Sequence, residues 1–306
     1  MTQNHPSDRV RIAVVSTPRS GNTWLRGLLA HLTDSAEVAQ HTPQEIPWEE
    51  LPERVVLQIH WYPSSDFRRQ LHEAGFKVVT ITRHPLDLLM SILHFCRHEV
   101  QTDRWLDGAE GNERGLVGAA PQDRVVREYA AGPRFRQLLG VSDSWWDLAD
   151  AAVRYEDLVA APEETLCRLA GELGLDGDLD SRVSAAVESR RLETMRSTSG
   201  NHHYWQGTPG GWRRLLPGRT ARRLSVPLAD LLAARGYVVD PIPELDARLA
   251  SQNWAAVEVR SGREHAPAVA GAGRSPALSL IRNLVLRDGR TVRPQLSGAA
   301  GAPRGR

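Results

Sequence analysis

Short apolar, β-branched runs that alternate with helix-patterned segments constrain the fold of this chain most strongly. In the runs, apolar residues follow one another directly, which is typical of strands buried on both faces of a sheet. Between the runs, apolar residues recur three or four positions apart, as on one face of a helix. The predicted strands span 9–16, 54–60, 77–82 and 151–155, and the predicted helices span 23–32, 66–75, 85–96 and 162–174. This alternation predicts an α/β fold with a mainly parallel sheet that helices flank on both faces.

Length and local composition predict one domain with two extensions. The 306 residues suit one large α/β domain or two small ones. We assign residues 9–245 to the folded domain, residues 1–8 to a flexible N-terminus, and residues 246–306 to a largely disordered or accessory C-terminal tail. Residues 97–150 are less regular, and their glycine-rich stretch "DGAEGNERGLVG" is typical of a mobile loop or lid.

Charge and residue usage exclude several classes of protein. The formal net charge of +1 argues against a nucleic-acid binder, which needs a basic face. No apolar stretch reaches the roughly 20 residues that span a bilayer, and the N-terminus lacks the apolar core of a signal peptide. We therefore expect a cytoplasmic protein without a membrane partner. Cys96 and Cys167 lie in apolar, helix-like stretches, which predicts two buried thiols and no metal site. The oligomeric state stays open, a homo-oligomer included.

The first strand–helix junction carries the sequence "STPRSGNTW" at residues 16–24. A loop between a strand and a helix is a general arrangement for phosphates, because backbone N–H groups and the positive end of the helix face the anion. The kinase-type loop G-x-x-x-x-G-K-[ST] is absent, since Gly21 is the only glycine and the basic residue, Arg19, precedes it. The junction predicts a P-loop-like anion site of another kind, with an ordinary βα turn as the alternative.

A second strand–helix junction, "TRHPLDLLMS" at residues 82–91, has similar chemistry. Arg83 ends the strand, and the planar guanidinium of arginine donates two hydrogen bonds at once to a phosphate. Ser91, nearly two helical turns later, adds a hydroxyl. The structural alternative is an ion pair between Arg83 and Asp87. Two such junctions in one sheet predict a ligand with two separate phosphate groups.

In order along residues 10–235, a series of motifs resembles those of the sulfotransferases that use 3'-phosphoadenosine 5'-phosphosulfate (PAPS). The motifs are "TPRSGNTW", "QIHWYP" (58–63), "RHPLDLLMS", "RYEDLVAAPEETL" (154–166) and "GTPGGWRRLL" (207–216). The resemblance implies that the first motif holds the 5'-phosphosulfate and that Arg83 and Ser91 hold the 3'-phosphate. It implies a sulfotransferase of the cytosolic type with PAPS as co-substrate and no metal.

The resemblance also implies roles for single residues of the phosphate loop. Arg19 stands where the family usually has a lysine beside the bridging oxygen, and it stays cationic throughout the reaction. The resemblance implies that Trp24 and Tyr155 contact the adenine and that Gly207 belongs to a closing loop. The residues that would hold the 5'-phosphate are Ser20, Gly21, Asn22 and Thr23, through backbone amides and the two hydroxyls.

His60 matches the family's catalytic histidine, and an imidazole is a good general base near neutral pH. The family often has a lysine two residues earlier, where this chain has Gln58. The closing motif departs further, because Trp205 and Gln206 replace two basic residues that would grip the 3'-phosphate. Arg213 or Arg214 could substitute for them, or the loop could bind through backbone amides.

The predicted function is transfer of a sulfuryl group from PAPS to a hydroxyl of a small-molecule acceptor, an alcohol or phenol. We expect Trp61, Tyr62 and Trp105 to line the acceptor pocket, although Trp145 and Trp146 are more typical of core residues. Two alternatives stay open: a kinase-like phosphotransferase with an aberrant phosphate loop, and a non-catalytic nucleotide-binding protein.

Overall fold

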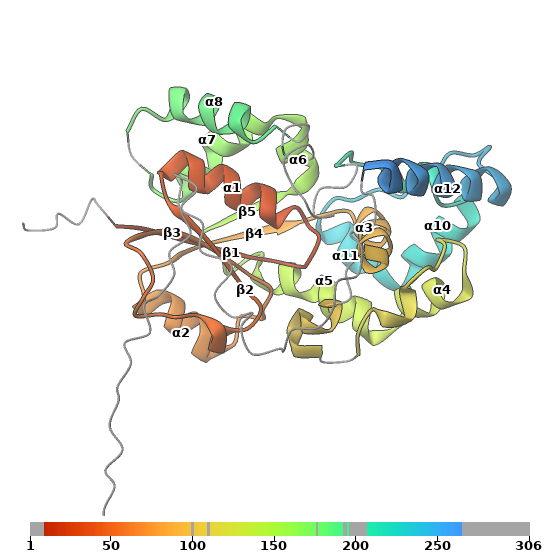
Figure 1. The fold of residues 1–306 in the computed structure, drawn as a ribbon, viewed down its shortest axis with the longest axis horizontal. Coiled ribbons are helices and arrows are strands. Elements are labelled where there is room, and N and C mark those ends of the chain that lie inside the picture. The colour runs from red at the N-terminus through yellow and green to blue at the C-terminus, as the bar shows by residue number, and fades with distance from the viewer. Residues whose placement is uncertain are drawn as a thin grey trace, which may run out of the picture.

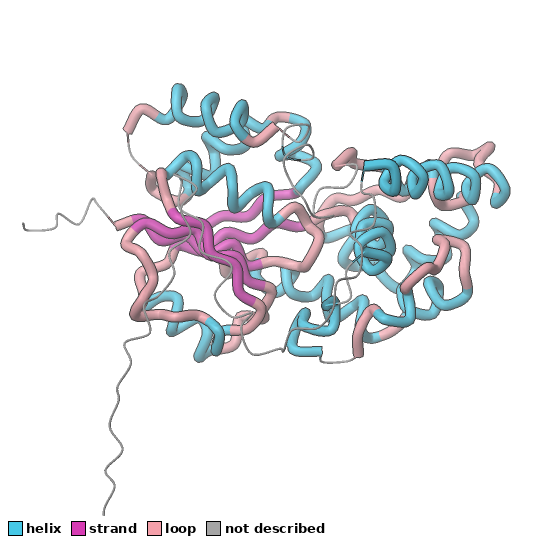
Figure 2. The backbone as a smooth tube through the Cα atoms, viewed as in Figure 1, coloured by secondary structure: helices cyan, strands magenta, loops and turns pink. Residues whose placement is uncertain are grey.

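The computed structural model describes residues 9–98, 101–108, 111–175, 177–191, 195 and 207–264. Its centre is one parallel sheet with the strand order β2-β3-β1-β4-β5 (Figure 2). The strands are β1 Val10–Val15, β2 Ala36–Gln40, β3 Arg54–Ile59, β4 Lys77–Thr82 and β5 Ala151–Arg154. The predicted parallel α/β sheet is therefore confirmed.

Helices cover both faces of the sheet, as predicted (Figure 1). Alternate residues of β1 face opposite sides, so Ile12 and Val14 join one core cluster and Ala13 and Val15 join the other. One face is covered by α1 Asn22–Thr33, α7 Pro162–Glu172 and α8 Leu179–Ser189, and the other by α2 Ser65–Glu73 and α5 Pro133–Trp145. Helices therefore shield both faces of the sheet from solvent, which explains the continuous apolar runs in the strands.

The helix that follows β4, α3 Pro85–His98, is buried along nearly its whole length. It contacts α10 Gly218–Ser225 and the 3-10 turns η4 Arg114–Leu116 and η5 Gly211–Arg214. Its buried positions include Asp87, Ser91 and His94. Buried polar groups need hydrogen-bond partners or a ligand, so these positions of α3 are candidates for a binding site.

Several elements were not predicted. The edge strand β2 has the mixed sequence AEVAQ and only one buried residue, so it lacks an apolar run. The less regular region 97–150 contains α4 Arg124–Ala131 and α5, so the expectation of irregular structure was wrong there. The remaining unpredicted elements are α6 Tyr155–Ala160, α8, α10, α11 Ala229–Ala234 and the 3-10 turns η2 Pro43–Glu45, η3 Gln101–Gly108, η4, η5 and η6 Val226–Leu228.

Part of the predicted disordered tail is a helix, α12 Ala247–Glu264. Trp254 is 4% exposed and belongs to the main core cluster, and Asn253 donates a hydrogen bond to the Arg214 carbonyl at 2.8 Å. This part of the tail is therefore an ordered helix that packs on the domain, and Ala250 and Trp254 are its buried residues. Residues 1–8 and 265–306 lie outside the described residues.

Burial of the thiols and aromatic residues matches the sequence analysis in part. Cys96 is buried, whereas Cys167 is only half-buried, and both are free. Trp145 is 1% exposed and is a core residue.

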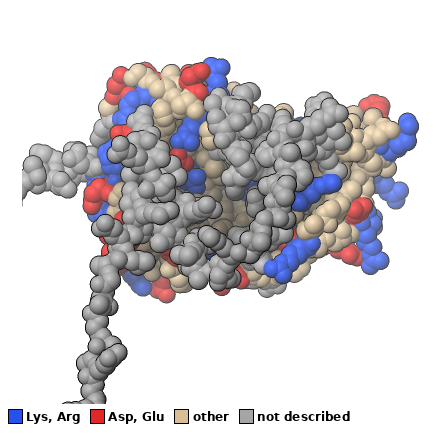
Figure 3. All heavy atoms as spheres, in the orientation of Figure 1, with Lys and Arg blue, Asp and Glu red and all other residues tan. Residues whose placement is uncertain are grey.

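Basic and acidic side chains lie interspersed on the face drawn in Figure 3. Among the helices of the described residues, none has both the length and the apolar character needed to cross a bilayer.

Candidate active site

The loop between β1 and α1 has an unusual backbone. Gly21 immediately precedes the helix with a φ of 104°, and Arg19 has a φ of 69°. Positive φ is rare for a residue with a Cβ, so Arg19 is held in a strained conformation. A Cβ at position 21 would lie 2.5 Å from Cδ2 of Tyr155. Both the backbone conformation and the close contact therefore require glycine at position 21.

Internal hydrogen bonds hold this loop in place. Ser16 Oγ donates to Asn22 Oδ1 at 2.7 Å, and Asn22 Nδ2 donates to the Thr17 carbonyl at 3.0 Å. The Thr17 backbone N–H donates to Ser142 Oγ of α5 at 2.7 Å. Ser20 Oγ, by contrast, is buried and has no hydrogen-bond partner within the described part of the chain. The loop is therefore held by its own hydrogen bonds and by α5, and it contains a buried hydroxyl without a hydrogen-bond partner among the described residues.

The topology brings Arg83 to the same loop. β1 and β4 are neighbours in the sheet, and the helices that follow them cover opposite faces. Ligands of such sheets bind at the carboxyl ends of the strands where the chain switches faces. Arg83 Nη1 donates to the Arg19 carbonyl at 3.3 Å, and its guanidinium lies 4.6 Å from the centre of the Tyr155 ring. Arg83 is 8% exposed, and its Nε has no partner among the described residues.

Arg19 reaches across the pocket to α3. Its Nε donates to Ser91 Oγ at 3.3 Å, and its guanidinium lies 4.4 Å from the centre of the Phe95 ring. Phe95 in turn stacks on Trp105, with ring centres 5.5 Å apart. The two predicted anion-binding junctions thus meet, since Arg19, Ser91 and Arg83 lie at one site. Two guanidinium groups that line one pocket favour an anionic ligand there.

Asp87 binds the backbone of the closing segment, residues 207–212, and does not pair with Arg83. The alternative of an Arg83–Asp87 ion pair is therefore wrong. The Asp87 carboxylate accepts hydrogen bonds from the backbone N–H groups of Gly210 at 2.6 Å and Trp212 at 2.9 Å. Tyr155 donates its hydroxyl hydrogen to the Gly207 carbonyl at 2.6 Å. These contacts fasten residues 207–212 over the site.

Arg213 and Arg214, the arginines that could substitute for basic residues of the closing motif, do not reach the pocket. Trp205 and Gln206 lie outside the described residues. Arg213 forms an ion pair with Asp240 and does not line the pocket. Arg214 is likewise absent from the lining. The described contacts therefore give neither arginine a place beside Arg83.

Trp24 and Tyr155 form one wall of the pocket. Their rings meet edge to face with centres 6.1 Å apart. Trp24 Nε1 donates to the Arg190 carbonyl at 2.8 Å, so the indole has a fixed position. Only 7% of Trp24 is exposed, but the exposed part faces the pocket.

His60 has a defined tautomer. Its Nδ1 lies 2.8 Å from the Ser16 carbonyl oxygen, which can only accept, so Nδ1 carries the hydrogen and Nε2 keeps its lone pair. Asn22 Nδ2 lies 3.5 Å from the same Nδ1, and Gln58 Nε2 lies 3.5 Å from Nε2. The free lone pair therefore belongs to the ring nitrogen next to Gln58.

Burial lowers the pKa of the His60 imidazole to about 4. The hydrogen bond to Ser16 opposes this shift, whereas the positive charges of His41, Arg19 and Arg26 add to it. His60 is 7% exposed. With this pKa the imidazole is neutral near pH 7, which is the state that a general base requires.

One pocket brings the predicted site residues together, with three exceptions. Ser20 is buried beneath the loop, and Trp61 and Tyr62 pack against the core instead. Tyr62 donates its hydroxyl to the Gln137 carbonyl at 2.5 Å, and the Trp61 carbonyl accepts from Trp145. The remaining predicted residues that line the pocket are Arg19, Gly21, Asn22, Thr23, Trp24, His60, Arg83, Ser91, Trp105, Tyr155 and Gly207.

Sequence reasoning missed Pro18, Gln58 and Phe95 as lining residues. Phe95 lies one helical turn after Ser91 on α3, and this spacing of four residues places both on one side of the helix. That spacing was a usable signal. Gln58 lies on β3 and His60 follows the last residue of that strand, two positions later, and both side chains line the pocket.

The sulfotransferase domain family matches residues 9–214, about two thirds of the chain. The chain belongs to this family. No curated protein matches this sulfotransferase by sequence. Among solved structures, mouse sulfotransferase SULT7A1 complexed with PAP is 17% identical with a TM-score of 0.54, and the match covers 73% of this chain and 85% of that one. Retinol dehydratase in complex with androsterone and inactive cofactor PAP is 16% identical with a TM-score of 0.48 and coverages of 74% and 82%.

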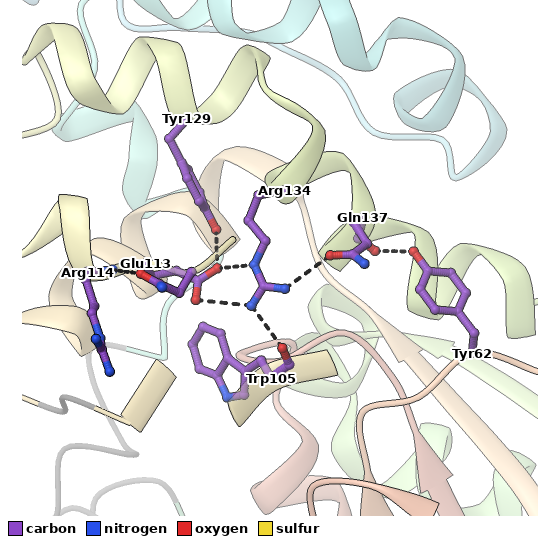
Figure 4. A network of polar contacts seen from close by, with 8 residues as sticks. Tyr62, Trp105, Glu113, Arg114, Tyr129, Arg134 and Gln137 are labelled. Carbon is purple, nitrogen blue, oxygen red and sulfur yellow. Dashed lines mark hydrogen bonds and ion pairs between the residues drawn. The ribbon is translucent and has the colours of Figure 1, made fainter. Parts of the chain in front are cut away.

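A buried ion pair of the sulfotransferase holds the segment that carries Trp105 (Figure 4). Arg134 Nε lies 2.8 Å from Glu113 Oε1, with the two side chains 5% and 0% exposed. Arg134 also donates to the Trp105 carbonyl at 3.0 Å, and Tyr129 donates to Glu113 at 3.0 Å. The network links Trp105 and Glu113 to α5 and so holds Trp105 at the wall of the pocket.

Clusters of three or more side chains able to ligate a metal do not occur among the described residues. The polar chemistry of the pocket is instead cationic and hydrogen-bonding, with Arg19, Arg83 and Ser91 as its main groups. Such a donor set suits an anionic ligand that carries phosphate or sulfate groups.

Proposed function

We propose that this sulfotransferase transfers a sulfuryl group from PAPS to a hydroxyl of a small-molecule acceptor. The observation that carries the proposal is the convergence of Arg19, Arg83 and His60 on one pocket. Two cationic groups with a neutral imidazole beside them match a donor with two anionic centres and an acceptor that must lose a proton.

The unused donors of the site support a cosubstrate with two phosphate groups. Arg83 lines the pocket and its Nε lacks a partner among the described residues, so a phosphate oxygen bound beside it would accept its hydrogen bond. Ser20 Oγ also lacks a partner there, but it lies beneath the phosphate loop. We assign the 5'-phosphosulfate to the backbone of residues 20–23 with Arg19, and the 3'-phosphate to Arg83 with Ser91. The adenine would lie against Trp24 and Tyr155, and Gly207 would help to close the site.

In the proposed reaction His60 Nε2 takes the proton of the acceptor hydroxyl. The hydroxyl oxygen attacks sulfur in line, and the bond between sulfur and the bridging oxygen of the 5'-phosphate breaks. The electron pair goes to the leaving adenosine 3',5'-bisphosphate (PAP), where Arg19 neutralises the developing charge. The sulfate ester and PAP are the products, and no metal takes part.

The acceptor side of the pocket favours an aromatic or apolar alcohol. Phe95 and Trp105 stack on each other beside Arg19, and together they offer flat apolar surface next to the reacting centre. Trp61 and Tyr62 do not line the pocket, so their part in acceptor binding stays a prediction. We infer that a phenol or a hydrophobic alcohol binds there.

Calorimetric titration of PAP tests the cosubstrate site. We expect wild type to bind PAP and Arg83→Ala to lose about 1.5–3 kcal/mol of binding free energy, the usual value of a charged hydrogen bond. Arg69→Ala on α2, where the side chain is 61% exposed, is the matched control and should bind like wild type. Folded wild-type protein that does not bind PAP would refute the proposal.

The two alternative functions have their own signatures. A kinase-like phosphotransferase would be stabilised against heat more by ATP with magnesium than by PAP. A non-catalytic protein would bind PAP and PAPS without turnover. Transfer of labelled sulfate from PAPS to a phenol distinguishes the enzyme from the binding protein.

A further inference from the structure

Gln58 lies beside His60 in the pocket, and its amide has only one allowed orientation. Gln58 Oε1 is 3.1 Å from Arg26 Nη1. A guanidinium only donates hydrogen bonds, so the amide oxygen must face Arg26. The amide NH₂ group therefore points the other way, toward His60 Nε2 at 3.5 Å. The pocket thus presents an N–H donor next to the lone pair of His60 Nε2.

A chain of ion pairs and hydrogen bonds holds Arg26 in place. Arg26 Nε lies 3.0 Å from Glu37 Oε2, and both side chains are less than one-fifth exposed. The other oxygen of Glu37 accepts from Arg190 Nη2 at 2.5 Å, and the Arg190 carbonyl accepts from Trp24 Nε1. The orientation of Gln58 is thus tied through α1 and β2 to the wall formed by Trp24.

We propose that Gln58, oriented by Arg26, binds the oxygen of the acceptor and makes the enzyme selective for hydroxyls over amines. The inference rests on the function proposed above. A hydroxyl oxygen has two lone pairs, so one can accept from Gln58 while the other attacks sulfur and the hydroxyl hydrogen goes to His60. A neutral amine nitrogen has one lone pair, which cannot accept from Gln58 and attack at the same time.

In this arrangement Gln58 touches the substrate, and Arg26 is a positioning residue that acts through Gln58. The charged or titratable groups that act on His60 are Arg19 from the phosphate loop, Arg26 from α1 and His41 after β2. Of these, Arg26 donates to Gln58. Removal of Arg26 should free the amide to turn its oxygen toward His60.

The first test is a pH titration of the His60 ring nitrogens by heteronuclear NMR, which needs no acceptor. An N–H group that faces Nε2 favours the neutral ring, so Gln58→Met should raise the pKa of His60. Arg26→Met should raise it by roughly half a unit or more, because a positive charge is lost and the amide is released. Arg26→Lys keeps the charge and should restore most of the wild-type value.

A control and a contrary result make the titration decisive. Arg168→Met on α7 removes an ion-paired arginine outside this network and should leave the pKa of His60 unchanged. A lower pKa in Gln58→Met would mean that the amide oxygen faces His60, and no change in Arg26→Met would mean that Arg26 does not act on the base. Either result would overturn the inference.

The second test compares matched acceptors, 2-naphthol and 2-naphthylamine, by PAPS-dependent release of PAP. We expect wild type to prefer the naphthol and Gln58→Met to lose about 5- to 10-fold of that preference, the value of one neutral hydrogen bond. An unchanged preference would refute the role in selectivity. Calorimetry with PAP distinguishes failure of the proposed function from failure of this inference. If wild type does not bind PAP, the proposed function is wrong. If wild type binds PAP but the variants leave the pKa of His60 unchanged, only this inference is wrong.

Discussion

Replacing Gly21 with alanine should damage both stability and cosubstrate binding. Gly21 has a φ of 104°, and its added Cβ would lie 2.5 Å from Cδ2 and 2.9 Å from Cε2 of Tyr155. Tyr155 is 3% exposed and holds both the Arg83 guanidinium and the Gly207 carbonyl. Any movement of the ring would disturb these two contacts, so the clash must displace either the loop or the site.

The loss of unfolding free energy expected for Gly21→Ala has two parts. A left-handed backbone costs a residue with a Cβ about 1–2 kcal/mol, and forcing an extra methyl group into a packed region costs roughly 1–3 kcal/mol. Gly174 is a matched control, because it also has a positive φ, 65°, but a Cβ there would meet nothing within 4 Å. We therefore expect Gly21→Ala to destabilise the fold by roughly 1–3 kcal/mol more than Gly174→Ala.

Urea unfolding of both variants measures this difference, and calorimetry with PAP measures the effect on the site. In a Tyr155→Leu background the difference should shrink, because the clashing ring atoms are gone and the two changes are coupled. Gly21→Ala that unfolds no more easily than Gly174→Ala would refute the reasoning. It would mean that Tyr155 can move without cost, and that the phosphate loop is less rigid than its hydrogen bonds indicate.

Three further predictions concern buried polar groups. The pKa of His60 is about 4 in the folded protein against 6.5 as the ordinary value, so the unfolded chain binds the proton more tightly and stability falls as pH drops from 6.5 toward 4. Between pH 7 and pH 4, wild type should lose roughly 3 kcal/mol more than His60→Gln in urea unfolding, and equal losses would contradict the burial argument. Glu113→Ala leaves Arg134 buried without its partner and should cost about 3–5 kcal/mol; a loss under about 1 kcal/mol, the value of an exposed pair, would contradict this. Asp87→Ala removes the acceptor of two backbone N–H groups and should cost about 1.5–3 kcal/mol and weaken PAP binding, whereas unchanged affinity would show that the closing segment is not needed for it.

Local patterns predicted the elements that make the sheet and the anion site. β1, β3 and β4 carry apolar runs because both of their faces are covered, and residues buried on both faces are apolar. β2 was not predicted because its sequence AEVAQ has only one buried residue and no apolar run. α12 packs on the domain through tertiary contacts, those of Trp254 among them, which its local composition did not indicate.

For the site, the sequence by itself determined which residues stand at the carboxyl ends of strands. Parallel strands place their carboxyl ends at one edge of the sheet, so the sequence already predicted that Arg19, His60 and Arg83 lie near one another. What the tertiary structure alone decided is how side chains from separate elements orient one another. Asp87 binds the closing segment and not Arg83, and Arg26 turns the Gln58 amide toward His60. The physical reason is that hydrogen-bond direction depends on three-dimensional partners that no spacing along the chain encodes.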